Sequence, residues 1–134
     1  LLEYYSADVQ ESPLVLIVDD DKGLNTVIMK YLEREFPNMQ LIQAFNGFDA
    51  GAQLANKKTN LVLLDLDLPG VDGFDICHRI NSSEEFGKPL VFVITSMDDS
   101  SVEEKLKKMG ACEYFKKPLN LVKIKDSLKT HLHL

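Results

Sequence analysis

Hydrophobic residues along this chain fall into short runs that alternate with longer amphipathic stretches. The runs 14–18, 61–65 and 90–94 are almost continuously apolar, which is typical of strands covered on both faces of a sheet. Two weaker segments, 40–44 and 112–116, also have strand length. The pattern therefore predicts five strands, three of which lie deep in a sheet.

A helical pattern follows each predicted strand. The first helix is indicated by apolar residues at i, i+3, i+4, i+7 and i+8, namely Leu24, Val27, Ile28, Tyr31 and Leu32. Four more helices are expected at 48–57, 74–81, 99–109 and 120–132. This alternation predicts a single α/β domain of residues 13–134, a doubly wound (βα)₅ fold with a parallel sheet and right-handed crossovers. Residues 1–12 are interpreted as an N-terminal tail or linker.

Composition narrows the class of protein. The net charge of −6 argues against binding of nucleic-acid phosphates by this domain. No apolar stretch approaches the ~20 residues needed to cross a membrane, and no signal peptide is evident, so a cytoplasmic protein is expected. Cys77 and Cys112 are far apart and are interpreted as reduced thiols. Because the chain starts at Leu1 rather than Met, it is interpreted as a piece of a longer protein.

Polar side chains stand directly after four of the predicted strands. These are the triplet Asp19, Asp20 and Asp21, then Asp65 with Asp67, then Thr95, and finally Lys117. The carboxyl ends of parallel strands meet at one edge of a sheet, where ligands bind. Crowded carboxylates raise one another's pKa values unless a cation intervenes, and Mg²⁺ prefers oxygen ligands. A carboxylate can also be a nucleophile toward a phosphoryl group. The sequence therefore predicts a Mg²⁺ and phosphoryl site, with Asp21 as a helix N-cap.

Four segments in this order resemble the receiver domains of two-component response regulators. They are VDDD at 18–21, LLDLDLPGVDG at 63–73, ITS at 94–96 and EYFKKP at 113–118. The resemblance covers about 14–132 and implies a flavodoxin-like, five-stranded parallel sheet in the order 2-1-3-4-5. It also implies a phosphorelay function and a signalling module rather than an enzyme acting on a separate substrate.

The resemblance assigns roles to the acidic residues. Asp65 is the expected phosphoacceptor and a metal ligand, and Asp20 is the expected direct Mg²⁺ ligand. Asp19 is expected to hold the metal through water. Asp67 matches the position that offers its backbone carbonyl to the metal.

The remaining roles concern the lysine and the switch. Lys117 is the expected active-site lysine, with its bond to Pro118 in the cis form. Thr95 is the switch hydroxyl and Tyr114 the switch aromatic. Met97 and the acid two residues after the acceptor occupy positions that influence phosphate lifetime in the family.

The expected phosphoryl donor is a phosphohistidine on a sensor histidine kinase or a histidine phosphotransfer protein, or a small acyl phosphate. An output domain, attached or separate, is expected as the target. Two alternatives stay open: a haloacid-dehalogenase-type phosphatase, in which Asp67 would be a general acid for Asp65, and a pseudo-receiver that docks partners without phosphorylation. His131 and His133 are expected to be solvated residues near the end of the chain.

Overall fold

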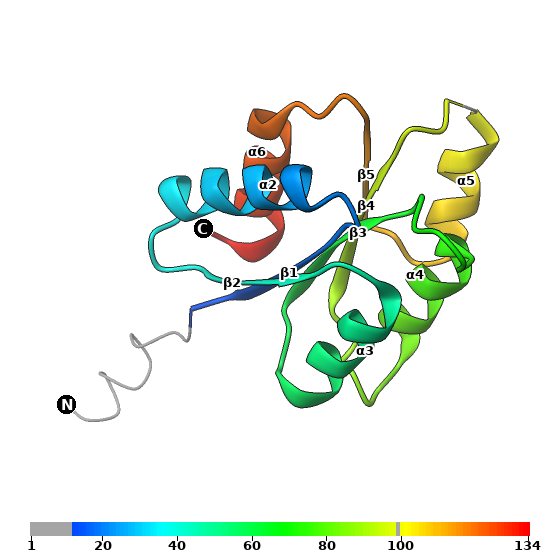
Figure 1. Cartoon of the computed structure of the whole chain (residues 1–134), viewed down its shortest axis with the longest axis horizontal. Coiled ribbons are helices and arrows are strands. Elements are labelled where there is room, and N and C mark those ends of the chain that lie inside the picture. The colour runs from blue at the N-terminus through cyan, green and yellow to red at the C-terminus, as the bar shows by residue number, and fades with distance from the viewer. Residues whose placement is uncertain (1–11, 99) are drawn as a thin grey trace.

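One parallel sheet forms the centre of the molecule (Figure 1). In the computed structural model, which describes residues 12–98 and 100–134, its strand order is β2-β1-β3-β4-β5. The strands are β1 (Leu14–Val18), β2 (Gln40–Ala44), β3 (Leu61–Asp65), β4 (Leu90–Thr95) and β5 (Glu113–Lys116). The fold class and the 2-1-3-4-5 order that the resemblance implied are therefore confirmed.

The helices cover both faces of the sheet. They are α2 (Lys22–Glu35), α3 (Gly47–Asn56), α4 (Gly73–Ser82), α5 (Ser100–Lys108) and α6 (Leu121–Leu132). Helices α2 and α6 lie on one face, and α3, α4 and α5 lie on the other (Figure 1). The four helices with predicted bounds have ends within one residue of the prediction, and α2 contains the apolar stripe predicted for the first helix. None of the described helices is long and apolar enough to span a membrane.

Alternate residues of each central strand belong to two separate cores, because strand side chains point to opposite faces in turn. In β1, Val15 and Ile17 pack beneath α2 and α6, whereas Leu16 and Val18 pack beneath the other three helices. All four side chains are at most 1% exposed. Burial of each such side chain stabilises the fold by roughly 1.5–3 kcal/mol. The uninterrupted apolar run in the sequence is the consequence of this two-sided burial.

Short polar side chains start the helices. Within the described residues the N-caps of α2, α3, α4 and α6 are Asp21, Asn46, Asp72 and Asn120, and each accepts a backbone N–H of the first turn. Such caps are worth about 1 kcal/mol each. The predicted cap role of Asp21 is confirmed. Residue 99, where the sequence placed the start of α5, lies outside the described residues, as does nearly all of the predicted tail 1–12.

The expectation of solvated histidines was wrong for His131. Its Nε2 lies 3.1 Å from Glu113 Oε1, and its ring packs edge-on against Phe92 with 5.3 Å between centroids. The C-terminal turn of α6 brings the imidazole to the start of β5, a long-range contact that local spacing does not reveal. His133 is exposed, as expected.

Candidate functional site

Three carboxylates converge where β1 and β3 end. Because these strands are neighbours in register, Asp19 and Asp65 emerge side by side. One oxygen each of Asp19, Asp20 and Asp65 lies within 4.8 Å of the others. Asp19 and Asp65 are only 1% exposed, whereas Asp20 faces solvent. The site is thus an acidic cluster with two buried members and an open side.

Asp19 has a carboxylate oxygen that lacks a hydrogen-bond partner. Its Oδ1 accepts the Asp21 amide at 2.9 Å, but no described residue donates a hydrogen bond to its buried Oδ2. The Lys117 ammonium is 3.9 Å from Oδ2, which is too long for a hydrogen bond. Burial and the adjacent Asp65 carboxylate raise the pKa of Asp19 to about 6, against the lowering effects of the Asp21 amide and Lys117. A divalent cation with oxygen ligands fits this unpaired oxygen and this charge.

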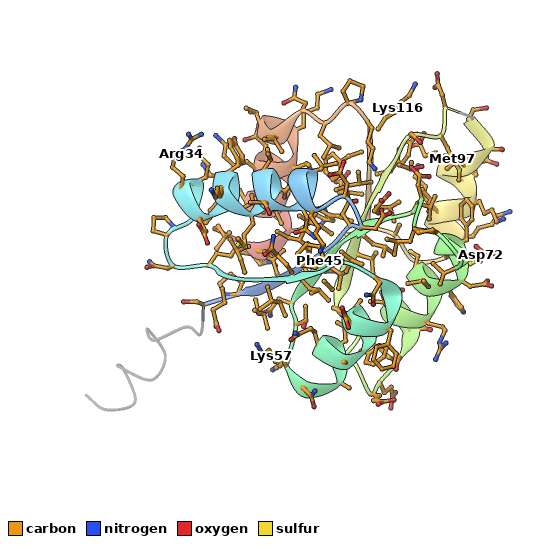
Figure 2. The ribbon with its side chains drawn as sticks, in the orientation of Figure 1. Arg34, Phe45, Lys57, Asp72, Met97 and Lys116 are labelled. Carbon is orange, nitrogen blue, oxygen red and sulfur yellow. The ribbon has the colours of Figure 1, made fainter. Side chains whose placement is uncertain are left out.

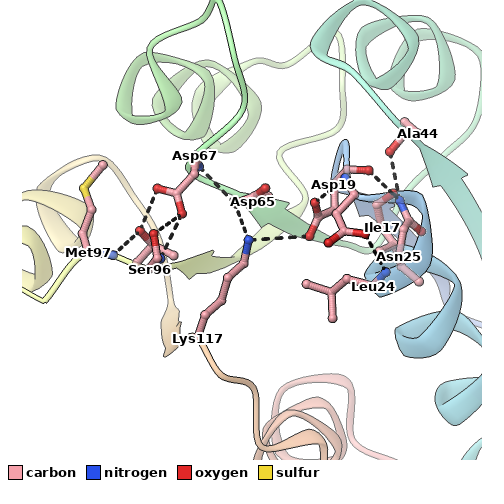
Figure 3. A network of polar contacts seen from close by, with 12 residues as sticks. Ile17, Asp19, Leu24, Asn25, Ala44, Asp65, Asp67, Ser96, Met97 and Lys117 are labelled. Atoms are coloured by element: carbon pink, nitrogen blue, oxygen red, sulfur yellow. Dashed lines mark hydrogen bonds and ion pairs between the residues drawn. The ribbon is translucent and has the colours of Figure 1, made fainter.

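Asp65 is held by two donors. The Asp67 amide donates to Asp65 Oδ1 at 3.0 Å, and Lys117 Nζ approaches the same oxygen at 3.4 Å (Figure 3). Burial lowers the pKa of Lys117, but the attraction of Asp65 and Asp19 outweighs this effect and raises it. The lysine is therefore a cation beside the carboxylates. Its bond to Pro118 is cis, as the resemblance implied.

The Asp67 side chain turns away from the acidic cluster toward the end of β4 (Figure 3). Its Oδ1 accepts the Thr95 hydroxyl at 3.1 Å, and its Oδ2 accepts both the amide and the hydroxyl of Ser96 at 2.9 Å. Burial alone would raise the pKa of Asp67, but these three hydrogen bonds lower it below its ordinary value. Asp67 is thus an ionised carboxylate whose two oxygens both accept hydrogen bonds from the end of β4 and the loop after it, contacts that the sequence did not predict.

Tyr114 lies on β5 next to the loop after β4. Its hydroxyl donates to the Met97 carbonyl at 3.0 Å, and the adjacent Lys116 pairs with Asp98 at 2.6 Å. Met97 and Lys116 lie at the same edge of the molecule (Figure 2). The two residues expected to form the switch, Thr95 and Tyr114, therefore both bond to the backbone of Met97, Thr95 through the amide and Tyr114 through the carbonyl.

A buried amide supports the acidic loop, and sequence reasoning missed it. Asn25 is fully buried, and its Nδ2 lies 3.1–3.3 Å from the carbonyls of Ile17, Asp19 and Ala44 (Figure 3). Its Oδ1 accepts Gln43 Nε2 at 3.0 Å. These bonds fasten the loop that carries Asp19 to the end of β2. A polar residue within the apolar stripe of the first helix was the signal that could have revealed it.

Comparison with known proteins decides the family. The sequence pattern of the response regulator receiver domain matches residues 15–129. The chain belongs to this family. The receiver domain is 32% identical over 120 residues to the sporulation initiation phosphotransferase F of Bacillus subtilis, covering 90% of this chain and 94% of the relative. It is 28% identical to the Helicobacter pylori transcriptional regulatory protein CrdR, covering 86% of this chain but 53% of that protein.

Solved structures agree with this assignment. The signal receiver domain of a DNA-binding response regulator from Colwellia psychrerythraea is 33% identical, with a TM-score of 0.86, over 92% of this chain and all of that one. A receiver domain of a LuxO-type repressor from Vibrio parahaemolyticus is 28% identical, with a TM-score of 0.82, over 91% of each chain. The chain is therefore a signalling module of two-component systems, and the phosphatase alternative is not favoured.

The site lies apart from the hollow between α3 and α4. That hollow has a volume of about 630 Å³ and mostly apolar walls that include Phe48, Leu54 and Ile80. Asp19, Asp20, Asp65, Lys117 and Thr95 do not line it. The acidic cluster is thus separate from this hollow, and its open side is at Asp20.

Proposed function

We propose that Asp65 is the phosphoacceptor of this receiver domain and that the reaction depends on Mg²⁺. The main support for the proposal is the environment of Asp65. This buried carboxylate at the end of β3 accepts hydrogen bonds from a backbone N–H and from Lys117, and the unpaired Oδ2 of Asp19 lies beside it. The two donors hold Asp65 Oδ1 in place. The second carboxylate oxygen, Oδ2, is left to attack the phosphorus atom. Positioning of this kind is the main demand of phosphoryl transfer.

Residues of the chain divide the work. The proposed holders of the metal are Asp20, Asp65 and the Asp67 backbone carbonyl, with Asp19 acting through water. When bound, the Mg²⁺ ion neutralises charge on phosphoryl oxygens. Lys117 offers a second positive charge within 3.4 Å of the acceptor. In the transfer, an Asp65 oxygen attacks phosphorus, the bond to the donor nitrogen breaks, and its electron pair leaves with the imidazole.

The donor and the output are also part of the proposal. A phosphohistidine of a sensor kinase or of a phosphotransfer protein is the proposed physiological donor, and acetyl phosphate is a usable substitute in the test. Phosphorylation then shifts the loop after β4 through Thr95 and Tyr114, which changes a surface read by an output domain. The pseudo-receiver alternative instead requires that Asp65 is never phosphorylated.

The test is intact mass spectrometry after incubation with Mg²⁺ and acetyl phosphate. We expect one phosphoryl adduct on the native chain, none on Asp65→Asn, and none in excess EDTA. Asp75→Asn is the matched control, because Asp75 is an exposed aspartate of α4 outside the site. An adduct that persists in Asp65→Asn, or native protein that acquires no adduct, would refute the assignment.

A further inference from the structure

The Asp67 carboxylate joins the phosphoacceptor segment to the loop that follows β4. Its backbone N–H holds Asp65, while its side chain receives all three hydrogen bonds from Thr95 and Ser96. The residue is half-buried, so water competes only partly for these bonds. Bonds to an ionised carboxylate are about twice as strong as those between neutral groups. Asp67 is therefore well placed to affect both the site and the loop.

The Thr95 hydroxyl acts as both donor and acceptor in this arrangement. This buried hydroxyl donates to Asp67 Oδ1 and accepts the Met97 amide at 3.1 Å. A hydroxyl has one proton, so it cannot donate to a phosphoryl oxygen on Asp65 while it donates to Asp67. Any use of Thr95 by a phosphoryl group thus requires that its bond to Asp67 breaks first.

The same loop has ties on its far side. The Tyr114 hydroxyl binds the Met97 carbonyl, and Lys116 pairs with Asp98. Of the four consecutive residues from Thr95 to Asp98, the first two are thus held by Asp67 and the last two by β5. A displacement of the Asp67 side chain is therefore transmitted to Tyr114 through the covalently linked loop residues Ser96 and Met97.

We propose that the Asp67 carboxylate is a loop restraint, meaning that it holds Thr95 and Ser96 in the unphosphorylated arrangement and opposes the switch. The inference rests on the proposed function, since it assumes that Asp65 carries the phosphoryl group. A phosphoryl group adds a charge of about −1.5 to −2 near this carboxylate and competes for the single Thr95 proton. Repulsion and competition together weaken the restraint when Asp65 is phosphorylated. Without it, the unphosphorylated protein should already populate the switched loop.

The restraint lowers the apparent affinity for any ligand that needs the switched loop, because only the competent fraction binds. Removing one hydrogen bond to a charged group corresponds to roughly a tenfold or larger change in such an equilibrium. Beryllofluoride with Mg²⁺ is a suitable probe, since it mimics a phosphoryl group on a carboxylate. We expect Asp67→Ala to bind the probe about tenfold more tightly than the native protein.

Loss of the Asp67 charge alone would also favour binding of an anionic probe, so variants that separate the charge from the hydrogen bonds are needed. Ser96→Ala removes one donor to Asp67 and leaves every charge in place. Because water competes for this exposed hydrogen bond, its loss should tighten probe binding by only about threefold, less than the tenfold expected for Asp67→Ala. Asp67→Asn removes the charge but keeps one acceptor oxygen, so its affinity should fall between the native protein and Asp67→Ala. Equal affinities of Asp67→Asn and Asp67→Ala, with Ser96→Ala unchanged, would mean charge alone and would overturn the restraint.

Amide chemical shifts give a second readout that a structural role would not produce. Without probe, the Met97 and Tyr114 amides of Asp67→Ala should lie part of the way toward their positions in the native protein with probe. Two outcomes would refute the restraint: the amide shifts stay at the positions of the native protein without probe, or they move off the line that joins the native positions without and with probe. Neither outcome bears on the phosphorylation of Asp65. If the native protein neither acquires phosphate nor binds the probe, both the proposed function and the restraint fall.

Discussion

Asp19 provides the sharpest test of the acidic cluster. We predict that Asp19→Asn stabilises the metal-free protein against unfolding. In the substitution, an amide oxygen can still accept the Asp21 amide, and an amide N–H2 replaces the unpaired Oδ2 beside Asp65. The variant therefore removes a buried charge and its repulsion, and it replaces an unpaired acceptor with an amide that can donate to Asp65.

The magnitude follows from the pKa of Asp19, which rises from an ordinary value of 3.8 to about 6 on folding. At about 1.4 kcal/mol for each tenfold change, ionising Asp19 in the folded state costs about 3 kcal/mol. A raised carboxyl pKa means that the folded state binds the extra proton, so the cost is complete above pH 6. It shrinks as the pH falls from 6 toward 3.8, to about 1 kcal/mol at pH 4.5. The pKa of about 6 already includes the attraction to Lys117, so about 3 kcal/mol is the net cost of ionising Asp19.

Urea denaturation followed by circular dichroism measures the effect, in EDTA at pH 7.5 and at pH 4.5. Asp126→Asn is the control, because Asp126 is an exposed aspartate on α6. Asp19→Asn should gain about 2–3 kcal/mol at the higher pH and clearly less at the lower one. Added Mg²⁺ should stabilise the native protein more than the variant. A variant no more stable than the native protein at pH 7.5, or a gain that does not shrink at pH 4.5, would refute the reasoning.

Three further predictions concern the scaffold. Asn25→Ala should lower the free energy of unfolding by about 2–3 kcal/mol in urea, because several buried groups lose their partner. Gly51→Ala should raise the free energy of unfolding by about 0.5–1 kcal/mol, since Gly51 lies inside α3 and a Cβ there would meet nothing within 4 Å. Cys77 should resist iodoacetamide at pH 8 and react in urea, as intact mass will show, because burial raises its thiol pKa to about 11.

Each of these has an internal comparison. Asn56→Ala, at the exposed end of α3, should change stability by less than about 0.5 kcal/mol, and an equal loss at both asparagines would contradict the role of Asn25. Gly73→Ala should destabilise, because its Cβ would collide with the Leu66 carbonyl, so the two glycines should respond with opposite sign. Cys112, whose pKa burial also raises, should be similarly slow to react. Rapid native alkylation of either thiol would contradict the burial argument.

Local pattern was sufficient for much of the fold. The apolar run 14–18 predicted β1 without error, because a strand covered on both faces has a nearly continuous apolar sequence. The weak run 40–44 was also found, although β2 is an edge strand with its first residue exposed. Helix ends were less exact: Asn120 was placed inside the last helix, whereas it is the N-cap. A cap and a first helical residue differ in backbone angles that periodicity does not report.

The sequence by itself determined the (βα)₅ alternation and the list of carboxylates, hydroxyl and lysine at the strand ends, since both follow from side-chain period and position along the chain. The strand order came from family resemblance, because no local pattern says which strands pair. Only the tertiary structure decided that Asp19 is buried while Asp20 is exposed, and that Asp67 turns to Ser96 rather than to the acidic cluster. The burial and the partners of these aspartates depend on donors and charges from loops that are distant in sequence. These groups interact only after the sheet has aligned the ends of its strands.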